Sequence, residues 1–291
     1  MSVARQSPCK INLLLNVIAK RDDGFHELET LMHPIRLHDE LEFSETAGGI
    51  MIDCNHPDLP TDSSNLIYRA AESFLSRANI DSGVFIRHQK NLPIAAGLAG
   101  GSANAAHTLR GLNELFGEPL AQSDLDEIAA QHGSDINFFL QDGPAIATGR
   151  GESVESLEPF PALANAGLVL INPGFGIPTP WAFKQLARYP EAITGSPGKI
   201  RQLADALSTE TFGAAADFFF NSLEAPVLPK YPALTEYRDF FTANGAHVSM
   251  MSGSGATTFA ITESPAAADE VAARARHRYG QKPWIRSLSL A

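Results

Sequence analysis

Three glycines within five residues, with a serine directly after the last one, form the clearest chemical pattern in this chain. They are Gly97, Gly100 and Gly101, and the serine is Ser102. Glycine allows successive backbone N–H groups to face one point, and a helix N-terminus adds free donors and the positive end of its dipole. The pattern predicts a phosphate cradle over residues 93–101, the glycine loop, opening into a helix over 102–116. A plain strand-to-helix turn with Ser102 as N-cap residue has the same pattern, which alone does not decide between the two.

The signatures of several other nucleotide and metal enzymes are missing from the sequence. It contains no GxxxxGK(S/T) phosphate loop, no GxGxxG dinucleotide motif, no H-R-D catalytic loop and no HExxH metal motif. The glycine loop also carries no lysine. The positive charge that a triphosphate needs therefore has to come from elsewhere, for example from Mg²⁺ or from Lys10.

An aspartate, Asp135, stands beside apolar residues directly after Gly133 and Ser134. The pattern predicts a helix that starts near Ser134 or Asp135, and an aspartate there would stabilise it by roughly 0.5–2 kcal/mol. This structural role is the commoner one for a lone aspartate. The alternative is a general base, because a carboxylate beside a lysine stays ionised and can accept the proton of an attacking hydroxyl.

Lys10 is the candidate partner of that aspartate. Residues 3–19 predict one long strand, in which Lys10 and Asn12 point to the same side. An exposed lysine at a sheet edge would show the same alternation, so the periodicity leaves both interpretations open.

Two further segments could contact a ligand. Phe25 and His26 follow a predicted turn over 20–24, where the ring could stack on a nucleobase and the imidazole could bond the base edge. A core aromatic beside a surface histidine is the commoner explanation. The Gly-Ser-Gly sequence within 252–256 is either a tight turn only or a turn that presents N–H groups to a phosphate.

The elements that would position these residues predict an α+β fold in two halves, 1–155 and 156–291. Strands near 40–46 and 50–54 flank Ala47-Gly48-Gly49, which predicts a hairpin. The other predicted elements are a helix capped by Ser63 or Ser64, a strand over 83–90, a linker over 152–161, and a strand–turn–strand–helix–strand ending over 247–289.

Composition limits the classes of partner. The net charge is −11, which argues against a broad basic face for nucleic acid. The two cysteines form no disulfide framework, and no apolar stretch approaches the roughly 20 residues of a membrane span. No signal peptide is visible, so a cytoplasmic protein without nucleic-acid or membrane partners is expected.

These motifs occur in the order found in the GHMP kinases, and the chain resembles that family over nearly its whole length. Its N-terminal run resembles the branch that phosphorylates a cytidine-diphosphate-linked methylerythritol. The resemblance rests on Ser7–Leu13, Arg21–His26, Leu31–Met32, the stretch 93–106, Gly133–Asp135, Ile177–Phe183 and Met251–Ala256.

The resemblance implies ATP-dependent phosphorylation of the 2-hydroxyl of 4-diphosphocytidyl-2-C-methyl-D-erythritol in the non-mevalonate isoprenoid route. Asp135 would be the general base, and Lys10 would orient the hydroxyl and the phosphate. The implied substrate-binding residues are Asn12 at the erythritol part, Phe25, His26 and Phe183 at cytosine, and Thr179 at the diphosphate.

The same resemblance implies ATP and Mg²⁺ as cofactors, with the metal ligands unknown, and a monomer or weak homodimer. The implied fold is an N-terminal domain like ribosomal protein S5 domain 2 followed by a ferredoxin-like C-terminal domain. The implied ATP-binding residues are Asn65, Leu66, Lys90, Pro93, Gly97, Leu98, Ala99, Gly100, Gly101, Ser102 and Ala103.

The chain departs from the family pattern at a few positions. Phe25 stands where the family usually has tyrosine, so stacking is retained while any contact from the phenol is lost. Ala95, Ala96 and Ala99 stand where some relatives carry glycine, although alanine resists a positive φ. Another GHMP kinase acting on a different alcohol, and a non-catalytic relative that only binds ligands, remain the alternatives.

Overall fold

The computed structural model describes residues 2–209 and 212–290, which form two compact units. Unit 1 comprises Met1–Cys9, Leu37–Leu92 and Ala99–Asp142, and unit 2 comprises Lys10–Arg36, Pro93–Leu98 and Gly143–Ala291. The units are discontinuous because strands β1 (Ser2–Lys20) and β2 (His26–Thr46) run through both. The glycine loop passes from unit 2 to unit 1 after Leu98. A division into sequence domains at residue 155 stays a prediction.

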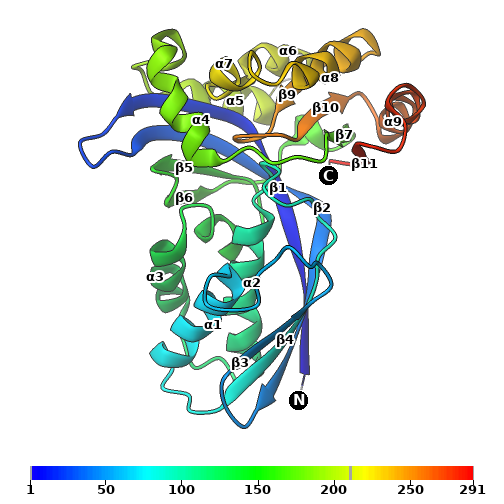
Figure 1. The fold of residues 1–291 in the computed structure, drawn as a ribbon. Coiled ribbons are helices and arrows are strands. Elements are labelled where there is room, and N and C mark those ends of the chain that lie inside the picture. Colours follow the sequence, from blue (N-terminus) through cyan, green and yellow to red (C-terminus); the bar gives the residue numbers. More distant parts are fainter. Residues whose placement is uncertain (1, 210–211, 291) are drawn as a thin grey trace. The chain divides into compact units, whose positions relative to one another are not determined.

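Unit 1 combines one edge of a sheet with a group of helices (Figure 1). Strands β3, β4 and β2 lie in that order, and β1 is the next neighbour of β2. Helix α1 packs against both α2 and α3. The elements of this unit are β3 (Ile50–Cys54), α1 (Leu66–Arg77), β4 (Gly83–Gln89), α2 (Gly100–Leu115), α3 (Gln122–His132) and the 3₁₀ helix η1 (Asn137–Leu140).

The hairpin predicted around Ala47-Gly48-Gly49 is wrong. Both of its strands exist, but β4 lies between them, antiparallel to β2 and parallel to β3. The amide of Val84 donates to Gly49 O at 2.8 Å, and a Cβ on Gly83 would lie only 2.2 Å from that same oxygen. The glycines therefore let β4 enter beside the turn, and this non-local pairing outweighs the local hairpin signal.

Helix α1 is capped by a different residue from those predicted. Asn65, instead of Ser63 or Ser64, occupies the N-cap position, and its side-chain oxygen accepts from the amide of Ile67 at 2.9 Å. Ala70 and Phe74 lie on the buried side of this helix. Such a cap contributes roughly 1 kcal/mol to the stability of the helix.

Helix α2 packs closely on strand β2. A Cβ on Gly111 would lie 2.4 Å from the ring of Phe43, so only glycine permits this approach. The helix predicted over 102–116 is confirmed by α2, and most of its residues are buried. They include Ala103, Ala106, Leu109 and Leu112.

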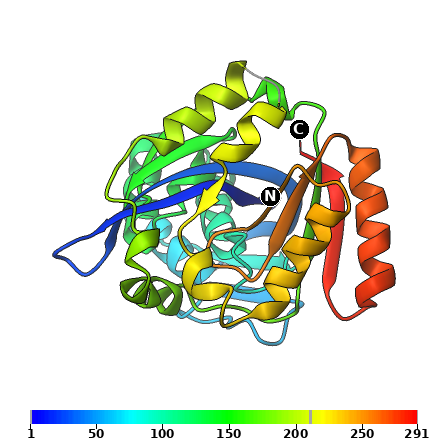
Figure 2. The ribbon, with the colours of Figure 1, turned by 90° about the horizontal axis from the view of Figure 1, so that it is seen from above.

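Unit 2 contains a four-stranded antiparallel sheet in the order β11, β7, β10, β9. Helix α9 lies along β11 and β7, and α8 packs on β9 and β10 (Figure 2). Every residue of the central strands β7 and β10 is buried. The predicted ending is confirmed by β9 (Val248–Met251), β10 (Thr258–Thr262), α9 (Pro265–Tyr279) and β11 (Trp284–Ser289), with β7 (Gly167–Asn172) and α8 (Pro232–Ala243) completing this layer.

The linker predicted over 152–161 is wrong in its first half. Ser153–Ser156 form strand β6, which pairs antiparallel with β5 (Ala145–Gly149), and β5 in turn pairs with residues 28–32 of β2. The remaining elements of unit 2 are η2 (Pro161–Leu163), α4 (Thr179–Gln185), η3 (Leu186–Arg188), η4 (Pro190–Ala192), α5 (Lys199–Thr209), α6 (Phe212–Ala215), η5 (Ala216–Phe218), β8 (Phe220–Asn221) and α7 (Glu224–Val227).

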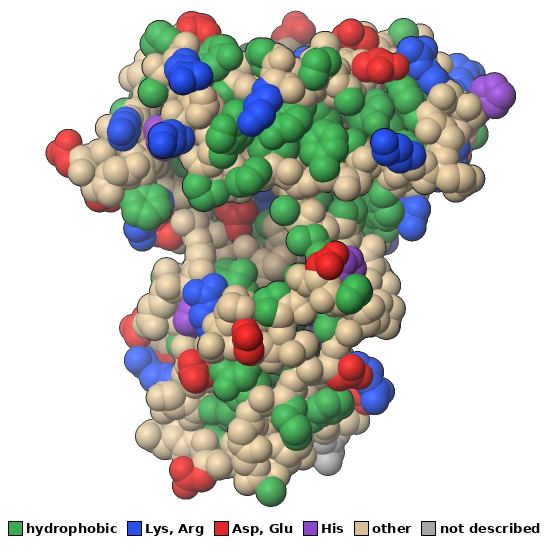
Figure 3. Space-filling view, viewed as in Figure 1, with side chains coloured by type: hydrophobic (Ala, Val, Ile, Leu, Met, Phe, Trp, Pro, Cys, Tyr) green, Lys and Arg blue, Asp and Glu red, His purple; other side chains and the backbone are tan. Residues whose placement is uncertain are grey.

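On the face shown in Figure 3, lysine and arginine side chains are scattered among acidic and hydrophobic ones. Within residues 2–209 and 212–290, no helix is both long and apolar enough to cross a membrane.

Candidate active site

Lys10 is buried in unit 2 with its ammonium held on two oxygens. Its Nζ donates to Asn12 Oδ1 at 2.5 Å and to the carbonyl oxygen of Gly97 at 3.2 Å. Only 3% of the surface of Lys10 is exposed. The predicted alternation is confirmed, because Lys10 and Asn12 do point to the same side of β1. The alternative of an exposed edge lysine is wrong.

Asn12 fixes the position of that ammonium. Its Nδ2 donates to Thr30 Oγ1 at 2.7 Å, and the Thr30 hydroxyl donates to Leu14 O at 2.6 Å. This chain of bonds sets the orientation of the amide, so that Oδ1 faces Lys10. A direct contact of Asn12 with a substrate stays a prediction.

The turn at 252–256 is bonded to the glycine loop within unit 2. The hydroxyl of Ser252 donates to Gly97 O at 3.0 Å, and the amide of Thr257 donates to Ala96 O at 3.1 Å. Gly97 has φ +77°, and a Cβ there would lie 2.1 Å from Ser252 O. The turn is therefore more than a tight connection, because it fixes the carbonyl that accepts from Lys10.

The backbone of the glycine loop alternates between left-handed and ordinary conformations. Positive φ values occur at Ala95 (+50°), Gly97 (+77°) and Ala99 (+54°), whereas Ala96 lacks one. A left-handed alanine costs roughly 1–2 kcal/mol. Ala95 and Ala99 thus adopt a conformation that glycine enters more easily, at a cost in stability.

Asn221 and Glu224 hold the strand that leads into the 252–256 turn. Asn221 Nδ2 donates to Met251 O at 2.8 Å and to Gly253 O at 2.9 Å, and Glu224 Oε1 accepts from the amide of Met251 at 2.7 Å. The other oxygen of Glu224 pairs with Arg238 at 3.0 Å. Burial raises the pKa of Glu224, although the charge of Arg238 acts in the opposite direction.

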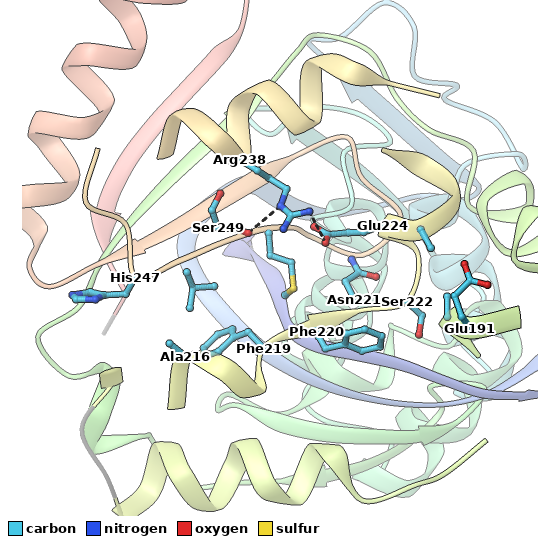
Figure 4. A pocket seen from close by; sticks show the side chains of 14 residues that line it. Glu191, Ala216, Phe219, Phe220, Asn221, Ser222, Glu224, Arg238, His247 and Ser249 are labelled. Atoms are coloured by element: carbon cyan, nitrogen blue, oxygen red, sulfur yellow. Dashed lines mark hydrogen bonds and ion pairs between the residues drawn. The ribbon is translucent and has the colours of Figure 1, made fainter. Parts of the chain in front are cut away.

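These supporting residues line a pocket of about 490 Å³ in unit 2 (Figure 4). Arg238 spans its upper wall, where it contacts both Glu224 and the carbonyl of Ser249. The sequence analysis missed Asn221 and Glu224, because neither belongs to a recognisable motif and their partners lie about 30 residues away.

The candidate nucleobase site of unit 2 is formed by aromatic residues of the β1–β2 turn and of α4. The rings of His26 and Phe183 lie 5.3 Å apart between centroids. Phe25 is 55% exposed, and the guanidinium of Arg150 lies 4.9 Å from its ring centroid. The alternative of a core phenylalanine is wrong, while the predicted stacking on cytosine stays a prediction.

The protonation state of His26 suits contact with a neutral base edge. Burial, with a smaller effect of Lys20, lowers the pKa of His26, which favours the neutral form of its imidazole. A neutral imidazole has one donor and one acceptor nitrogen.

Helix α4 is linked to the 252–256 turn by a pair of hydroxyl groups. Those of Thr179 and Ser254 lie 2.9 Å apart.

In unit 1, helix α2 begins with two glycines, and no side chain caps its N-terminus. Ala99 occupies the N-cap position and makes no side-chain cap bond, so the alternative with Ser102 as N-cap residue is wrong. Ser102 lies in the first turn, where backbone N–H groups have no partner within the helix. The donors required of a phosphate cradle are thus the amides of Gly100, Gly101 and Ser102.

Asn65 and Leu66 lie beside this end of α2. Both polar atoms of the Asn65 side chain are bonded locally, because Nδ2 donates to Pro60 O at 2.6 Å while Oδ1 caps α1. A Cβ on Gly101 would lie 3.6 Å from a methyl group of Leu66. Pro93 and Leu98 lie in the unit 2 part of the loop, and Ala103 is buried in α2.

Lys90 forms a buried ion pair. Its Nζ lies 2.5 Å from Asp39 Oδ2, and its side chain is only 5% exposed. The ammonium is directed toward Asp39. The predicted role of Lys90 near ATP stays a prediction.

Asp135 lies half-buried in a turn between α3 and η1 of unit 1. The helix predicted to start near Ser134 or Asp135 is wrong, because residues 134–136 form a turn and only the short η1 follows. The buried rings of Phe138 and Phe139 pack edge to face at 4.9 Å and anchor the turn. Asp135 belongs to unit 1 and Lys10 to unit 2, so the surroundings of each are described within its own unit.

The carboxylate, imidazole and thiol groups of residues 2–209 and 212–290 do not gather into a metal site. No group of three or more His, Cys, Asp or Glu side chains there is placed to hold a metal ion.

Known proteins resemble this chain over most of its length. The GHMP kinases N terminal domain matches residues 65–149, and the GHMP kinases C terminal domain matches residues 200–281. A 4-diphosphocytidyl-2-C-methyl-D-erythritol kinase from Exiguobacterium sibiricum is 40% identical over 264 residues, which cover 90% of each chain. Its counterpart from Acaryochloris marina is 41% identical over 92% of this chain and 89% of its own. The chain belongs to the GHMP kinase family.

Solved structures agree with the family assignment. A crystal structure of 4-(cytidine 5'-diphospho)-2C-methyl-D-erythritol kinase has a TM-score of 0.80 at 33% identity, covering 98% of this chain and 99% of the other. A homoserine kinase from Cytophaga hutchinsonii, at 18% identity and a TM-score of 0.79, shares the fold. The predicted α+β, two-domain GHMP kinase fold is thus confirmed, and the chain is a kinase.

Proposed function

We propose that this protein transfers the γ-phosphoryl group of ATP to the 2-hydroxyl of 4-diphosphocytidyl-2-C-methyl-D-erythritol, a step of the non-mevalonate isoprenoid route. The observation that carries the proposal is the identity of 36–41% to kinases named for this substrate, over 87–95% of the chain. The position of Lys10 within unit 2 supports the proposal, because its ammonium is fixed against Gly97 of the glycine loop.

In the proposed mechanism, Asp135 accepts the proton of the 2-hydroxyl as its oxygen attacks the γ-phosphorus in line. Lys10 orients the hydroxyl and balances negative charge on the transferred group. Little covalent chemistry is required of the protein, because most of the rate enhancement of phosphoryl transfer comes from positioning and charge stabilisation.

The phosphates of ATP would be held by the backbone amides at the start of α2. The uncapped first turn supplies the N–H groups of Gly100, Gly101 and Ser102, and the helix dipole favours negative charge there. Mg²⁺, when bound, would neutralise charge on the β- and γ-phosphates, and Ser102 and Asp135 carry oxygen atoms of the kind it prefers.

The cytosine ring would be bound by Phe25, His26 and Phe183, and the diphosphate by Thr179. Exposure of the Phe25 ring and the lowered pKa of His26 both support this assignment. A site of this kind has no purpose in a kinase for homoserine or mevalonate. It therefore argues against the alternative of another GHMP kinase.

The test is a coupled ADP-release assay with Mg·ATP and three acceptors: the cytidyl substrate, mevalonate and homoserine. We expect turnover with the cytidyl substrate alone. Turnover with another alcohol would retain the kinase and discard the cytosine site. No turnover with any acceptor, in a sample that still binds ATP, would support the non-catalytic relative.

The same assay tests the general base. Asp135→Asn keeps the size of the side chain and removes its basicity, so kcat should fall by about two to four orders of magnitude. The affinity for ATP, measured by calorimetry without acceptor, should change by less than about threefold. A kcat within tenfold of wild type would refute the role of Asp135.

A further inference from the structure

One carboxylate in unit 1 accepts hydrogen bonds from four residues around the glycine loop. Asp39, on β2, is fully buried. Its Oδ1 accepts from the amides of Asn91 at 2.8 Å and Leu92 at 2.9 Å. Its Oδ2 accepts from Lys90 Nζ at 2.5 Å and from Asn104 Nδ2 at 2.9 Å.

The four donors lie on either side of the phosphate-binding segment in the sequence. Asn91 and Leu92 directly precede Pro93, the first residue of the glycine loop, and Asn104 lies in α2 two residues after Ser102. A Cβ on Gly100 would lie 3.3 Å from Lys90 Nζ and 3.7 Å from Asp39 Oδ2. The ion pair therefore packs directly against the first residue of α2.

The charge of this carboxylate is stable over the working pH range. Burial acts to raise the pKa of Asp39, but His88, the charge of Lys90 and the amide of Asn91 outweigh it and hold the pKa well below the ordinary value. Removing one partner of a buried ion pair is costly, because it leaves the other charge buried and unpaired. In the intact protein, both oxygens of Asp39 have their hydrogen-bond donors.

We propose that Asp39 is a positioning residue for the nucleotide: it fixes the start of α2 so that the amides of Gly100, Gly101 and Ser102 converge on the phosphates of ATP. The proposal rests on the proposed function for its ligand, and on the contacts within unit 1 for its geometry. Lys90 neutralises the carboxylate from inside the protein, which explains why this lysine is buried.

The test variant is Asp39→Asn, which keeps the volume of the side chain. Its amide group would face two donors, Lys90 Nζ and Asn104 Nδ2, and both bonds at Oδ2 would be lost. We expect the Kd of ATP, measured by calorimetry, to rise about tenfold, while KM for the cytidyl substrate stays within twofold.

Glu29→Gln is the matched control. Glu29 is 3% exposed and also accepts several bonds, from Asn16 Nδ2 at 2.9 Å and from the amides of Gly198 and Ile200, but it lies in unit 2 away from the N-terminus of α2 in the sequence. This variant should lower Tm to a similar extent and leave the Kd of ATP within twofold. If Asp39→Asn does not fold, Asn104→Ala takes its place, because it removes the side chain that joins Asp39 to α2. The Kd of ATP should then rise at least about threefold.

A second measurement separates this inference from the proposed function. Hydrogen exchange without nucleotide should become at least about tenfold faster over residues 103–107, where the amides of α2 begin to have acceptors within the helix, in Asp39→Asn, and should not change there in Glu29→Gln. Normal exchange in this segment, or a Kd of ATP within twofold of wild type, would overturn the role of Asp39. Failure of wild-type protein to bind ATP would instead refute the proposed function and leave the exchange result to decide the geometry.

Discussion

Replacing Gly97 by alanine should be the most damaging single-methyl change in the glycine loop. The new Cβ would lie 2.1 Å from Ser252 O, 3.0 Å from Gly255 N and 3.1 Å from Gly255 O. All three are backbone atoms of the 252–256 turn, so no side-chain rotation can relieve the overlap. The turn or the loop has to move by about an ångström, given that carbon–oxygen contacts are ordinarily above 3 Å.

The energetic cost has two parts. A left-handed alanine costs roughly 1–2 kcal/mol, and overpacking of a closely packed site adds typically 1–3 kcal/mol. The sum, roughly 2–5 kcal/mol, corresponds to a fall in Tm of about 3–8 °C for a protein of this size. Activity should fall further than stability suggests, because Gly97 O accepts from both Lys10 and Ser252.

Gly101→Ala is the matched control for stability. A Cβ there would meet nothing closer than 3.6 Å, and Gly101 has no positive φ. Because alanine favours a helix over glycine by roughly 0.5–1 kcal/mol, its Tm should be unchanged or slightly higher. Differential scanning calorimetry of both variants decides the matter: a Gly97→Ala protein within about 2 °C of wild type would refute the argument.

Three further outcomes are expected. Phe183→Ala should raise KM for the cytidyl substrate about tenfold and leave KM for ATP unchanged in steady-state assays, and an equal rise in both would contradict the base site. Ala99→Gly should raise Tm by about 1–2 °C in a thermal melt, because relief of roughly 1–2 kcal/mol of strain exceeds the added entropy of the unfolded chain. Burial, with smaller electrostatic effects, lowers the pKa of His33 and His107 to about 4, below the unfolded value of about 6.5. The contribution of these neutral histidines to the free energy of unfolding is therefore fully present above pH 6.5 and is lost as the pH falls toward 4. Urea unfolding at pH 7 and pH 5 should show a loss of roughly 2 kcal/mol per histidine, and a His107→Gln variant with an unchanged loss would contradict this assignment.

Local pattern was sufficient for the elements whose signals lie within a few residues. The alternation of residues 3–19 placed Lys10 and Asn12 on one side of a strand, and β1 confirms it. The glycine loop followed by α2 was also predictable, since glycine freedom and helix initiation are local properties. The final strand–turn–strand–helix–strand series was predictable for the same reason.

Non-local pairing was not predictable from those signals. Insertion of β4 between β2 and β3 depends on a close approach of Gly83 to Gly49, which no local pattern reports. The strand at 153–156 was taken for a linker because its burial is slight and its stability comes from pairing with β5.

Support of the candidate site was the least predictable feature. Asp39 and Asn221 act through partners far away in the sequence, and neither stands in a motif. A single sequence shows such residues only as isolated polar side chains. Their importance becomes visible when all buried hydrogen bonds are accounted for.

The most direct test of the proposed reaction is ³¹P NMR of the product formed from Mg·ATP and the cytidyl substrate, recorded without proton decoupling. The 2-carbon of the acceptor carries a methyl group and no hydrogen, so a phosphate on its oxygen has no proton three bonds away. We predict a new phosphomonoester signal that is an unsplit singlet and grows in step with ADP. A doublet or triplet would mean transfer to a secondary or primary hydroxyl, and ADP without a new phosphomonoester would mean hydrolysis; either result would contradict the account.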